Sequence, residues 1–341
     1  MKKPYVFFLM AALAVACSSG FVIPEPVKGN VQNGSSEQPE TPEQPETPEQ
    51  PENPEQPENP DTPEDPEDPG KIKDTEKIYG LVADGNDEGT YALITAAGYG
   101  YETPDTSGEH AKEPFRHIKQ TYDKRLKKYV FDFYLHIQND DDRGKADVID
   151  RQRNEIKTDG HSPDSLVAQY GQTLQIRWKF RLPAGMKTTT KFSHIHQLKG
   201  IDNKEGTADV SLPAITFTCR SLSSGKQQMQ VLYTASDVES NGSTTYLARA
   251  DLADFLDEWV SVTETVTFAD EGSYSVVINR MYDGKELVKV ENYKLDLWRT
   301  GCTGMRPKWG LYRNFGKNRE IADQLRDEVL KFADFSIHKI K

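Results

Sequence analysis

The chain has 341 residues, of which 54 are acidic and 42 basic, giving a formal charge of −12. Residues 1–70 contain 14 acidic and 3 basic residues, a net charge of −11, which leaves 40 acidic and 39 basic residues in 71–341. The acidic balance therefore belongs to the amino-terminal tail. The remaining segment of about 270 residues suits one large domain, and it lacks the basic excess of a nucleic-acid-binding protein.

The apolar residues 5–15 follow Lys2 and Lys3 and end in small residues before Cys17. This run is shorter than the roughly 20 residues of a transmembrane helix, and its layout predicts a secretory signal peptide. Ala14-Val15-Ala16-Cys17 resembles a bacterial lipoprotein box, which implies a signal peptide over 1–17 and lipidation of Cys17; ordinary cleavage near Ala16 is the alternative. We expect the protein in the cell envelope, anchored by acyl chains to the outer membrane and facing the periplasm or the exterior.

Eleven prolines occupy every third position from Pro39 to Pro69, with Glu, Gln, Asn, Asp and Thr between them. A polyproline II helix has three residues per turn, so these prolines would share one face. At about 3.1 Å per residue, residues 37–70 could extend for roughly 105 Å. We expect 18–70 to be a disordered spacer between the anchor and a domain at 71–341; a proline-recognition segment is the alternative.

Alternation of apolar and polar residues predicts strands through most of 71–341. Tyr129, Phe131 and Phe133 begin the clearest example. The expected strands cover residues 129–137, 174–181, 192–199, 214–220, 228–234, 260–268, 274–282, 287–297, 309–315 and 331–340. Asp283-Gly284 between two of them predicts a hairpin turn.

Helical periodicity is confined to two short segments, 248–257 and 319–330. Many strands, few helices and no alternation of strand with helix predict an all-β fold, an antiparallel β-sandwich of the jelly-roll, concanavalin-like kind. Cys219 and Cys302 could pair in an oxidising compartment; two free thiols are the alternative.

Three strand segments carry polar groups that share a face at period two. In the first, Arg151, Arg153, Glu155 and Lys157 project together. In the second, His194 and His196 lie two residues apart. In the third, Lys308, Tyr312 and Asn314 line one face, and Gly310 is expected to leave an open space between Lys308 and Tyr312.

Each segment also has an ordinary interpretation when it is taken alone. The charged first segment could be a solvated strand face. The two histidines could bind one metal ion, although no third ligand is evident from the sequence, or they could belong to a plain polar face. A Tyr near a Lys on a strand is often structural.

Together, and in this order, the segments resemble the signature strands of jelly-roll polysaccharide lyases of the alginate-lyase type. Those strands read Arg-x-Glu-Leu/Val-Arg, Gln-Ile-His and Phe-Lys-x-Gly-x-Tyr. The matching segments here are Arg153-Asn154-Glu155-Ile156-Lys157, His194-Ile195-His196 and Lys308-Trp309-Gly310-Leu311-Tyr312. The sequence around Lys308 is also similar to the corresponding strand of heparin lyases and glucuronan lyases, which share this architecture. Two positions depart from the alginate-lyase pattern, with His194 in place of Gln and Lys157 in place of the last Arg.

The resemblance implies a concave substrate cleft and cleavage of a uronic-acid-containing polysaccharide by β-elimination. Such a reaction removes the C5 proton beside the carboxylate and expels the oxygen at C4, so donors aimed at the developing charge are needed. Arg153 offers a bidentate fork to the carboxylate and His194 a second bond, while Lys308 would add positive charge. His196 and Tyr312 are then the expected base and acid, with the pKa of Tyr312 lowered by neighbouring cations.

Further residues are expected to orient these groups or to bind sugar units. Glu155 would orient Arg153, and the remaining substrate-binding candidates are Lys157, Arg177, Lys179 and Asn314, with Arg181 extending the same basic track. A solvated face is the alternative for that track. The run Asn139-Asp140-Asp141-Asp142-Arg143-Gly144 could bind calcium, as could Asp84, Asn86 and Asp87, but polar turns are the favoured interpretation, and we expect no cofactor.

The leading hypothesis is a lipid-anchored, monomeric polysaccharide lyase whose partners are an acidic polysaccharide and the membrane, without nucleic acid. The main alternative is a surface glycan-binding lipoprotein on the same sandwich, which would expose an aromatic platform. A glycoside hydrolase needs two acids set close together on neighbouring strands, and no such strand is visible in the sequence.

Overall fold

The computed structural model describes residues 79–106, 115–145, 147–236 and 242–340. These residues belong to one unit of the chain, Pro69–Lys341. The expected signal peptide, lipidation site and proline-rich spacer lie outside the described residues. Within the described ranges, no helix has both the length and the apolar character needed to cross a membrane.

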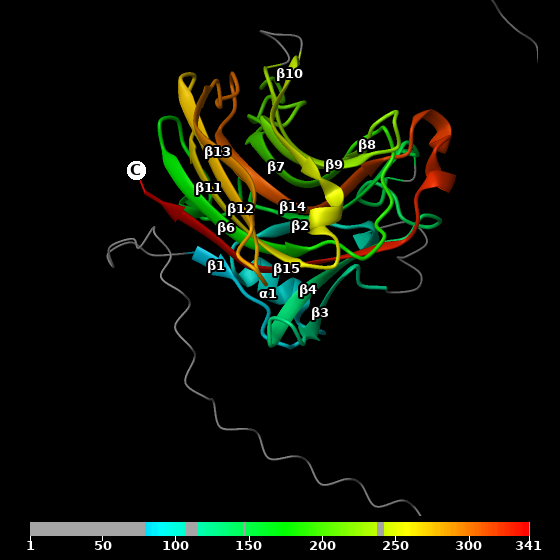
Figure 1. The fold of residues 1–341 in the computed structure, drawn as a ribbon. Helices are drawn as coiled ribbons and strands as arrows, with labels where there is room; N and C mark the ends of the chain where they lie inside the picture. Colours follow the sequence, from blue (N-terminus) through cyan, green and yellow to red (C-terminus); the bar gives the residue numbers. More distant parts are fainter. Residues whose placement is uncertain (1–78, 107–114, 146, 237–241, 341) are drawn as a thin grey trace, which may run out of the picture. The chain divides into compact units, whose positions relative to one another are not determined.

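Two antiparallel sheets make up this unit (Figure 1). One has the strand order β10-β9-β8-β7-β14-β5-β2, with the bounds β2 Gly100–Glu102, β5 Arg151–Lys157, β7 Ser193–Ile201, β8 Ile215–Ser221, β9 Gln227–Thr234, β10 Thr244–Asp251 and β14 Gly304–Asn314. The other has the order β13-β12-β11-β6-β15-β4-β3, with β1 paired to β15 and the bounds β1 Tyr79–Leu81, β3 Ile118–Asp123, β4 Lys128–Leu135, β6 Thr173–Arg181, β11 Trp259–Thr267, β12 Gly272–Arg280, β13 Glu286–Leu295 and β15 Glu328–Lys339.

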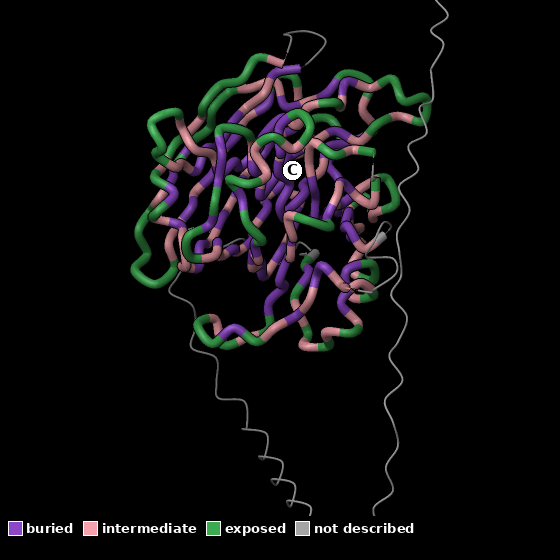
Figure 2. The backbone as a smooth tube through the Cα atoms, turned by 90° about the vertical axis from the view of Figure 1, so that its right-hand side faces the viewer, coloured by how far each residue is buried: buried purple, intermediate pink, exposed green. Residues whose placement is uncertain are grey.

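The core lies between the two sheets, and Figure 2 shows buried residues gathered in the interior of this unit and exposed residues at its periphery. On β6, Leu174, Ile176, Trp178 and Phe180 are buried and alternate with more exposed polar residues. The ring of Trp178 lies 5.6 Å from that of Phe217 on the opposite sheet. Burying one large apolar side chain stabilises the fold by about 1.5–3 kcal/mol, so alternation at period two holds the sandwich together and the predicted fold class is confirmed.

The strands β7, β8, β9 and β14 are strongly bent in Figure 1. The face of their sheet that points away from the core lies on the inside of this bend. A concave surface is what the predicted cleft requires, and the predicted site segments lie on β5, β7 and β14 of this sheet.

The two predicted helices are wrong. Residues 244–251 form β10, which pairs with β9, and only a short 3-10 turn, Leu252–Phe255, follows. Two further 3-10 turns, Lys317–Arg319 and Ala322–Gln324, precede β15. Backbone pairing with a neighbouring strand outweighed local helix propensity at β10, whereas the helix that does form, α1 at Thr90–Ala96, was missed.

Two smaller expectations have clear outcomes. The hairpin turn between β12 and β13 is confirmed, and Gly284 adopts a φ of 68° there, a left-handed conformation that costs glycine little. Cys219 and Cys302 are both free, so the pairing considered for them is wrong; Cys219 is a buried core residue instead.

Candidate functional site

Strand β14 lies between β5 and β7 and brings the three predicted segments together. Tyr312 stands directly opposite both Arg153 and His194. Opposite residues of an antiparallel pair project from the same face, whereas Trp309 and Ile156 point into the core. We call the face that carries Tyr312 the site face, and the prediction that Arg153, His194 and Tyr312 share it is confirmed.

Six charged residues of β2, β5, β14 and the 139–145 turn form a compact group that we call the ion cluster: Glu102, Asp142, Arg153, Glu155, Lys157 and Lys308. Nζ of Lys308 lies 2.5 Å from Glu102 Oε2 and 2.6 Å from Glu155 Oε2. Nη1 of Arg153 lies 3.0 and 3.1 Å from the same two carboxylates, and its Nε lies 2.8 Å from Asp142 Oδ1. Glu155 therefore orients Arg153, as expected.

Charge balance favours the ionised form of the carboxylates in the cluster, although burial lowers the pKa of Lys308. Burial would raise the pKa of Glu155, but Lys308 and Arg153 outweigh it and hold this pKa below its ordinary value. The pKa of Glu102 lies well below its usual range for the same reason. Lys308 is only 1% exposed, so its ammonium group is enclosed by the two carboxylates and joins the strands; it is not open to a ligand.

The phenol of Tyr312 lies among cations at the surface of this cluster. The Arg153 guanidinium carbon is 3.8 Å from the ring centroid, and Arg151 Nη1 donates a hydrogen bond to the hydroxyl at 2.9 Å. Burial nonetheless outweighs both arginines and raises the pKa of Tyr312, so the expected lowering is wrong. The hydroxyl keeps its proton at neutral pH and is suited to donate it.

His194 is the histidine of the site face. Its ring stacks on Phe192 at 4.3 Å and lies 6.0 Å from the ring of Tyr312, and its Nδ1 is 2.8 Å from the hydroxyl of Thr218. Burial, reinforced by nearby arginines, lowers the pKa of His194 to about 3. A neutral imidazole therefore faces the phenol of Tyr312.

The prediction that His196 shares a face with His194 is wrong. A β-bulge interrupts the pairing of β7 with β8 between His194 and His196, so that His194 lies opposite Thr218 and His196 opposite the next residue, Phe217. One extra residue in a strand turns the following side chain to the other face. His196 is fully buried between the sheets, which removes it as the base.

The open space expected at Gly310 is also absent. Gly310 has a φ of 143°, and a Cβ there would lie 2.0 Å from the backbone oxygen of Asn154 on β5. The glycine is required because β14 approaches β5 closely at this point. It thereby sets the separation of the strands that carry Tyr312 and Arg153.

Arg177 and Lys179 lie on β6, which belongs to the other sheet. Since Trp178 between them points into the core, their side chains project from the opposite side of the sandwich. Nζ of Lys179 lies 2.9 Å from Asp334 Oδ2 on β15. The predicted extension of the basic track through Arg177, Lys179 and Arg181 is therefore wrong, because period two identifies a face but not the sheet to which it belongs.

The remaining predicted binding residues occupy the two ends of the site face. Lys157 is partly exposed, with its Nζ 3.1 Å from Glu102 Oε1 and 3.4 Å from Asp159 Oδ2. Asn314 accepts a hydrogen bond from Gly316 N at 2.8 Å. Asn314 lines a surface hollow of about 550 Å³ whose other walls include Asp147, Asp150, Lys191 and Lys317.

Several cations of the site face were not predicted. Lys199 and Arg306 stand directly opposite each other, and Arg220 is close enough to His194 to influence its charge. Burial, together with Lys308, Arg153 and Arg306, lowers the pKa of Lys199 to about 8. Nε and Nη1 of Arg306 are buried and have no hydrogen-bond partner within the described part of the chain. Such a group attracts an anion.

The sequence contained a signal for some of these residues. Arg306 lies two positions before Lys308, so period two places it on the site face. Arg151 carries the same signal. Lys199 carried no such signal, because it follows the bulge between His194 and His196, and only the hydrogen bond of Gln197 to Glu155 shows which face it shares. Glu102 carried none, because it reaches Lys308 only through the pairing of β2 with β5.

The two acidic turns considered for calcium bind their own neighbours. Asp140 contacts His117 and His136, Asp141 accepts a hydrogen bond from Gly144, and Asp142 contacts Arg153, so these three carboxylates diverge. Near the start of the domain, Asp84 accepts a hydrogen bond from Asn86 N at 2.9 Å, and Asp87 pairs with Arg116.

No model of a known protein family matches the chain, and a comparison with curated proteins finds no match. Solved structures with a similar fold include alginate lyase A1-II′, a member of polysaccharide lyase family 7 (13% identity, TM-score 0.43, covering 71% of this chain and 94% of that one). Others are the marine PL-14 alginate lyase from Aplysia kurodai (11%, 0.43, 65% and 86%) and the endo-β-1,4-glucuronan lyase from the fungus Trichoderma reesei (10%, 0.43, 70% and 94%).

Proposed function

We propose that this protein is a polysaccharide lyase that cleaves a uronic-acid-containing polysaccharide by β-elimination and leaves an unsaturated uronate end. The observation that carries the proposal is the pairing of two proton-exchanging groups of suitable form on one cationic surface. Tyr312 is a protonated phenol supported by Arg151, and His194 is a neutral imidazole whose ring lies 6.0 Å away.

The cations of the site face suit the first requirement of this reaction, which is to bind the uronate carboxylate and stabilise the charge that develops on it. Arg153 contacts Glu102, Glu155 and Asp142 through Nη1 and Nε, which leaves Nη2 for the substrate. Lys199 and Arg306 would bind the carboxylates of neighbouring sugar units. These cations are fixed in advance, because the ion cluster and the strand pairing hold them.

Proton transfer then follows from the forms of the two groups. Neutral His194 accepts the proton from C5, the C5–H electrons form the C4=C5 double bond, and the bond from C4 to the bridging oxygen breaks. Because burial makes His194 a weak base, the bound substrate carboxylate is needed to stabilise the imidazolium that forms. Tyr312 gives its proton to that oxygen. The resulting phenolate is stabilised by the hydrogen bond from Arg151 and by the guanidinium of Arg153 over its ring.

The experiment follows absorbance near 235 nm while the protein is incubated with alginate, glucuronan and heparin-type polysaccharides. Wild type is compared with Tyr312→Phe, His194→Gln and Lys179→Gln, each checked by its melting temperature. We expect absorbance to rise with one substrate class and the rate to fall by about 100-fold or more in the first two variants. Lys179→Gln, which lies on the other side of the sandwich, serves as the control with an unchanged rate.

Two results would contradict the lyase. Full activity in Tyr312→Phe would remove the phenol from the mechanism. Absence of absorbance with every polymer, together with measurable binding of one of them, would indicate the glycan-binding lipoprotein instead. We also propose that the enzyme acts from the cell envelope, held there by lipid on Cys17, because the residues before this cysteine have the layout of an export signal.

A further inference from the structure

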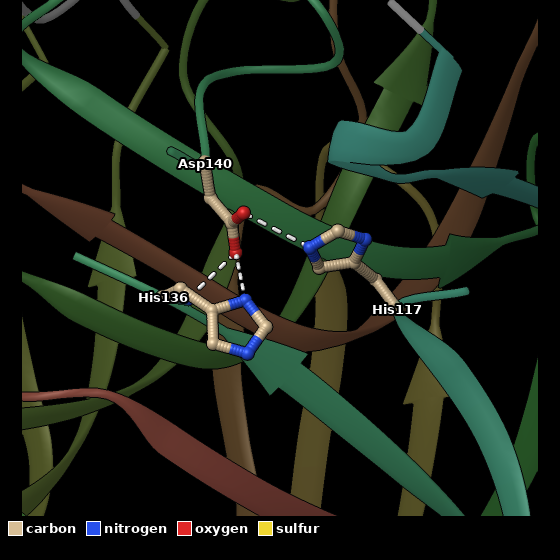
Figure 3. Close-up of side chains that lie close together, drawn as sticks. All are labelled: His117, His136 and Asp140. Carbon is tan, nitrogen blue, oxygen red and sulfur yellow. Dashed lines mark hydrogen bonds and ion pairs between the residues drawn. The ribbon is translucent and has the colours of Figure 1, made fainter. Parts of the chain in front are cut away.

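A second polar cluster lies behind the site, on the core side of β5. It consists of His117 immediately before β3, His136 immediately after β4, and Asp140 in the following turn (Figure 3). The ligand atoms of these three residues all lie within 4.8 Å of one another. The side chains of His117 and Asp140 are fully buried, and that of His136 is 31% exposed.

Two separations inside the cluster are close to those of groups that share one metal ion. The full spread of up to 4.8 Å is wider than one ion can span, so the partly exposed His136 must turn inward when the ion binds. Nε2 of His117 lies 2.9 Å from Asp140 Oδ1, and Nδ1 of His136 lies 3.3 Å from Asp140 Oδ2. Ligands about 2.1 Å from a tetrahedral Zn²⁺ stand about 3.4 Å apart. Two imidazole nitrogens and one carboxylate oxygen are also the donor types that this class of ion takes.

The surroundings of the cluster support the same interpretation. Nδ1 of His117 is bound to Asp105, and a carboxylate on the far nitrogen of a histidine is the usual partner of a metal ligand because it fixes the ring and its tautomer. In the tautomer that carries its proton on Nδ1, Nε2 presents a lone pair to Asp140, and a cation between these two acceptors would satisfy both. Phe115 packs edge-on against both histidine rings, at 5.0 and 4.9 Å, and supplies an apolar wall.

The cluster is connected to the site through β5. Gln152 Nε2 donates to the backbone oxygen of His136 at 2.9 Å, and Asn154 Nδ2 donates to that of His117 at 2.8 Å. The turn that carries Asp140 also carries Asp142, which binds Nε of Arg153 at 2.8 Å. A ligand that holds this turn in place therefore also holds the side chain of Arg153 in place.

We propose that His117, His136 and Asp140 bind one divalent transition-metal ion of the zinc class, which anchors the 139–145 turn and β5 behind the site. Its role is structural and independent of the proposed reaction. The three ligands leave a fourth position for water. The ion replaces the proton that would otherwise lie between His117 and Asp140. The buried carboxylate therefore keeps a positive partner away from water.

The test uses the full chain, freed of metal with a chelator and then titrated with Zn²⁺ or Co²⁺. We expect one equivalent to bind, Co²⁺ to give the visible absorption of a low-symmetry site, and saturating Zn²⁺ to raise the melting temperature by about 5 °C. His136→Gln should abolish all three effects. His161→Gln, at a histidine whose side chain is 99% exposed, should leave them intact.

Absence of Co²⁺ absorption and of a Zn²⁺-dependent rise in melting temperature in wild type would overturn the proposal, and His117 would then be a protonated bridge between Asp105 and Asp140. Metal effects that persist in His136→Gln would also overturn it. Both outcomes are measured without substrate, so they are distinct from failure of the lyase proposal.

Discussion

The carboxylate of Glu264 is buried in the core between the sheets. There it depends on polar side chains for its hydrogen bonds. Trp178 and Tyr274 donate hydrogen bonds to it at 3.1 and 2.8 Å, and Nε2 of His196 lies 3.0 Å away. His196 also contacts the backbone oxygen of Lys308 through Nδ1 at 2.8 Å. This histidine therefore links the core to the strand that carries Tyr312, without reaching the site face.

We therefore expect His196→Ala to lower the stability of the fold while leaving the groups that carry out the reaction in place. Loss of the buried ring and of one neighbour of Glu264 should lower the free energy of unfolding by about 3 kcal/mol. The turnover number of the folded fraction should fall by less than about tenfold, against the 100-fold or more expected for a proton-transfer group. Denaturant titration and the 235 nm assay, run on the same preparation, separate the two quantities. A large loss of turnover with unchanged stability would return His196 to the reaction.

At the scale of the strand, the contact between β14 and β5 depends on Gly310. A methyl group there would meet the Asn154 backbone oxygen at 2.0 Å, so the strands would have to separate and the stacking of Arg153 on Tyr312 would weaken. We expect Gly310→Ala to cost about 3 kcal/mol of unfolding free energy and to reduce activity as well.

A matched control isolates the cause of that loss. Gly284 also has a positive φ, 68°, but nothing lies within 4 Å of a Cβ at this position. Gly284→Ala should therefore cost only the backbone strain, about 1 kcal/mol, and leave the 235 nm rate unchanged. Equal losses in the two variants would show that the close approach of β14 to β5 is not what makes Gly310 necessary.

Strands also explain how far the sequence could predict the site. Whereas only the resemblance to the lyase signature strands brought Arg153 and Tyr312 together, alternation located ten strands, because period two is a local property of the chain. It failed at His196, where a bulge reverses the alternation, and a bulge depends on pairing with β8 and β14. It failed again at Arg177, because the order of strands in the two sheets is set by contacts between distant segments.

At the scale of the molecule, the described part of the core cluster extends from Leu81 to Ile337. This core stabilises the sandwich. The predicted lipid on Cys17 would hold the domain at a membrane, since each buried methylene contributes about 0.8 kcal/mol to anchoring.

We expect Cys17→Ser in the full chain to move the protein from the membrane fraction to the soluble fraction of the producing bacterium. The melting temperature and the 235 nm rate per molecule should stay at the wild-type values, because the described core and site face are built from residues between Leu81 and Ile337. Fractionation followed by immunoblotting measures the first effect, and the purified proteins give the other two. Retention of the Cys17→Ser variant in the membrane fraction would show that something other than this cysteine holds the domain there, and an altered rate would show that the amino-terminal segment contributes to the site.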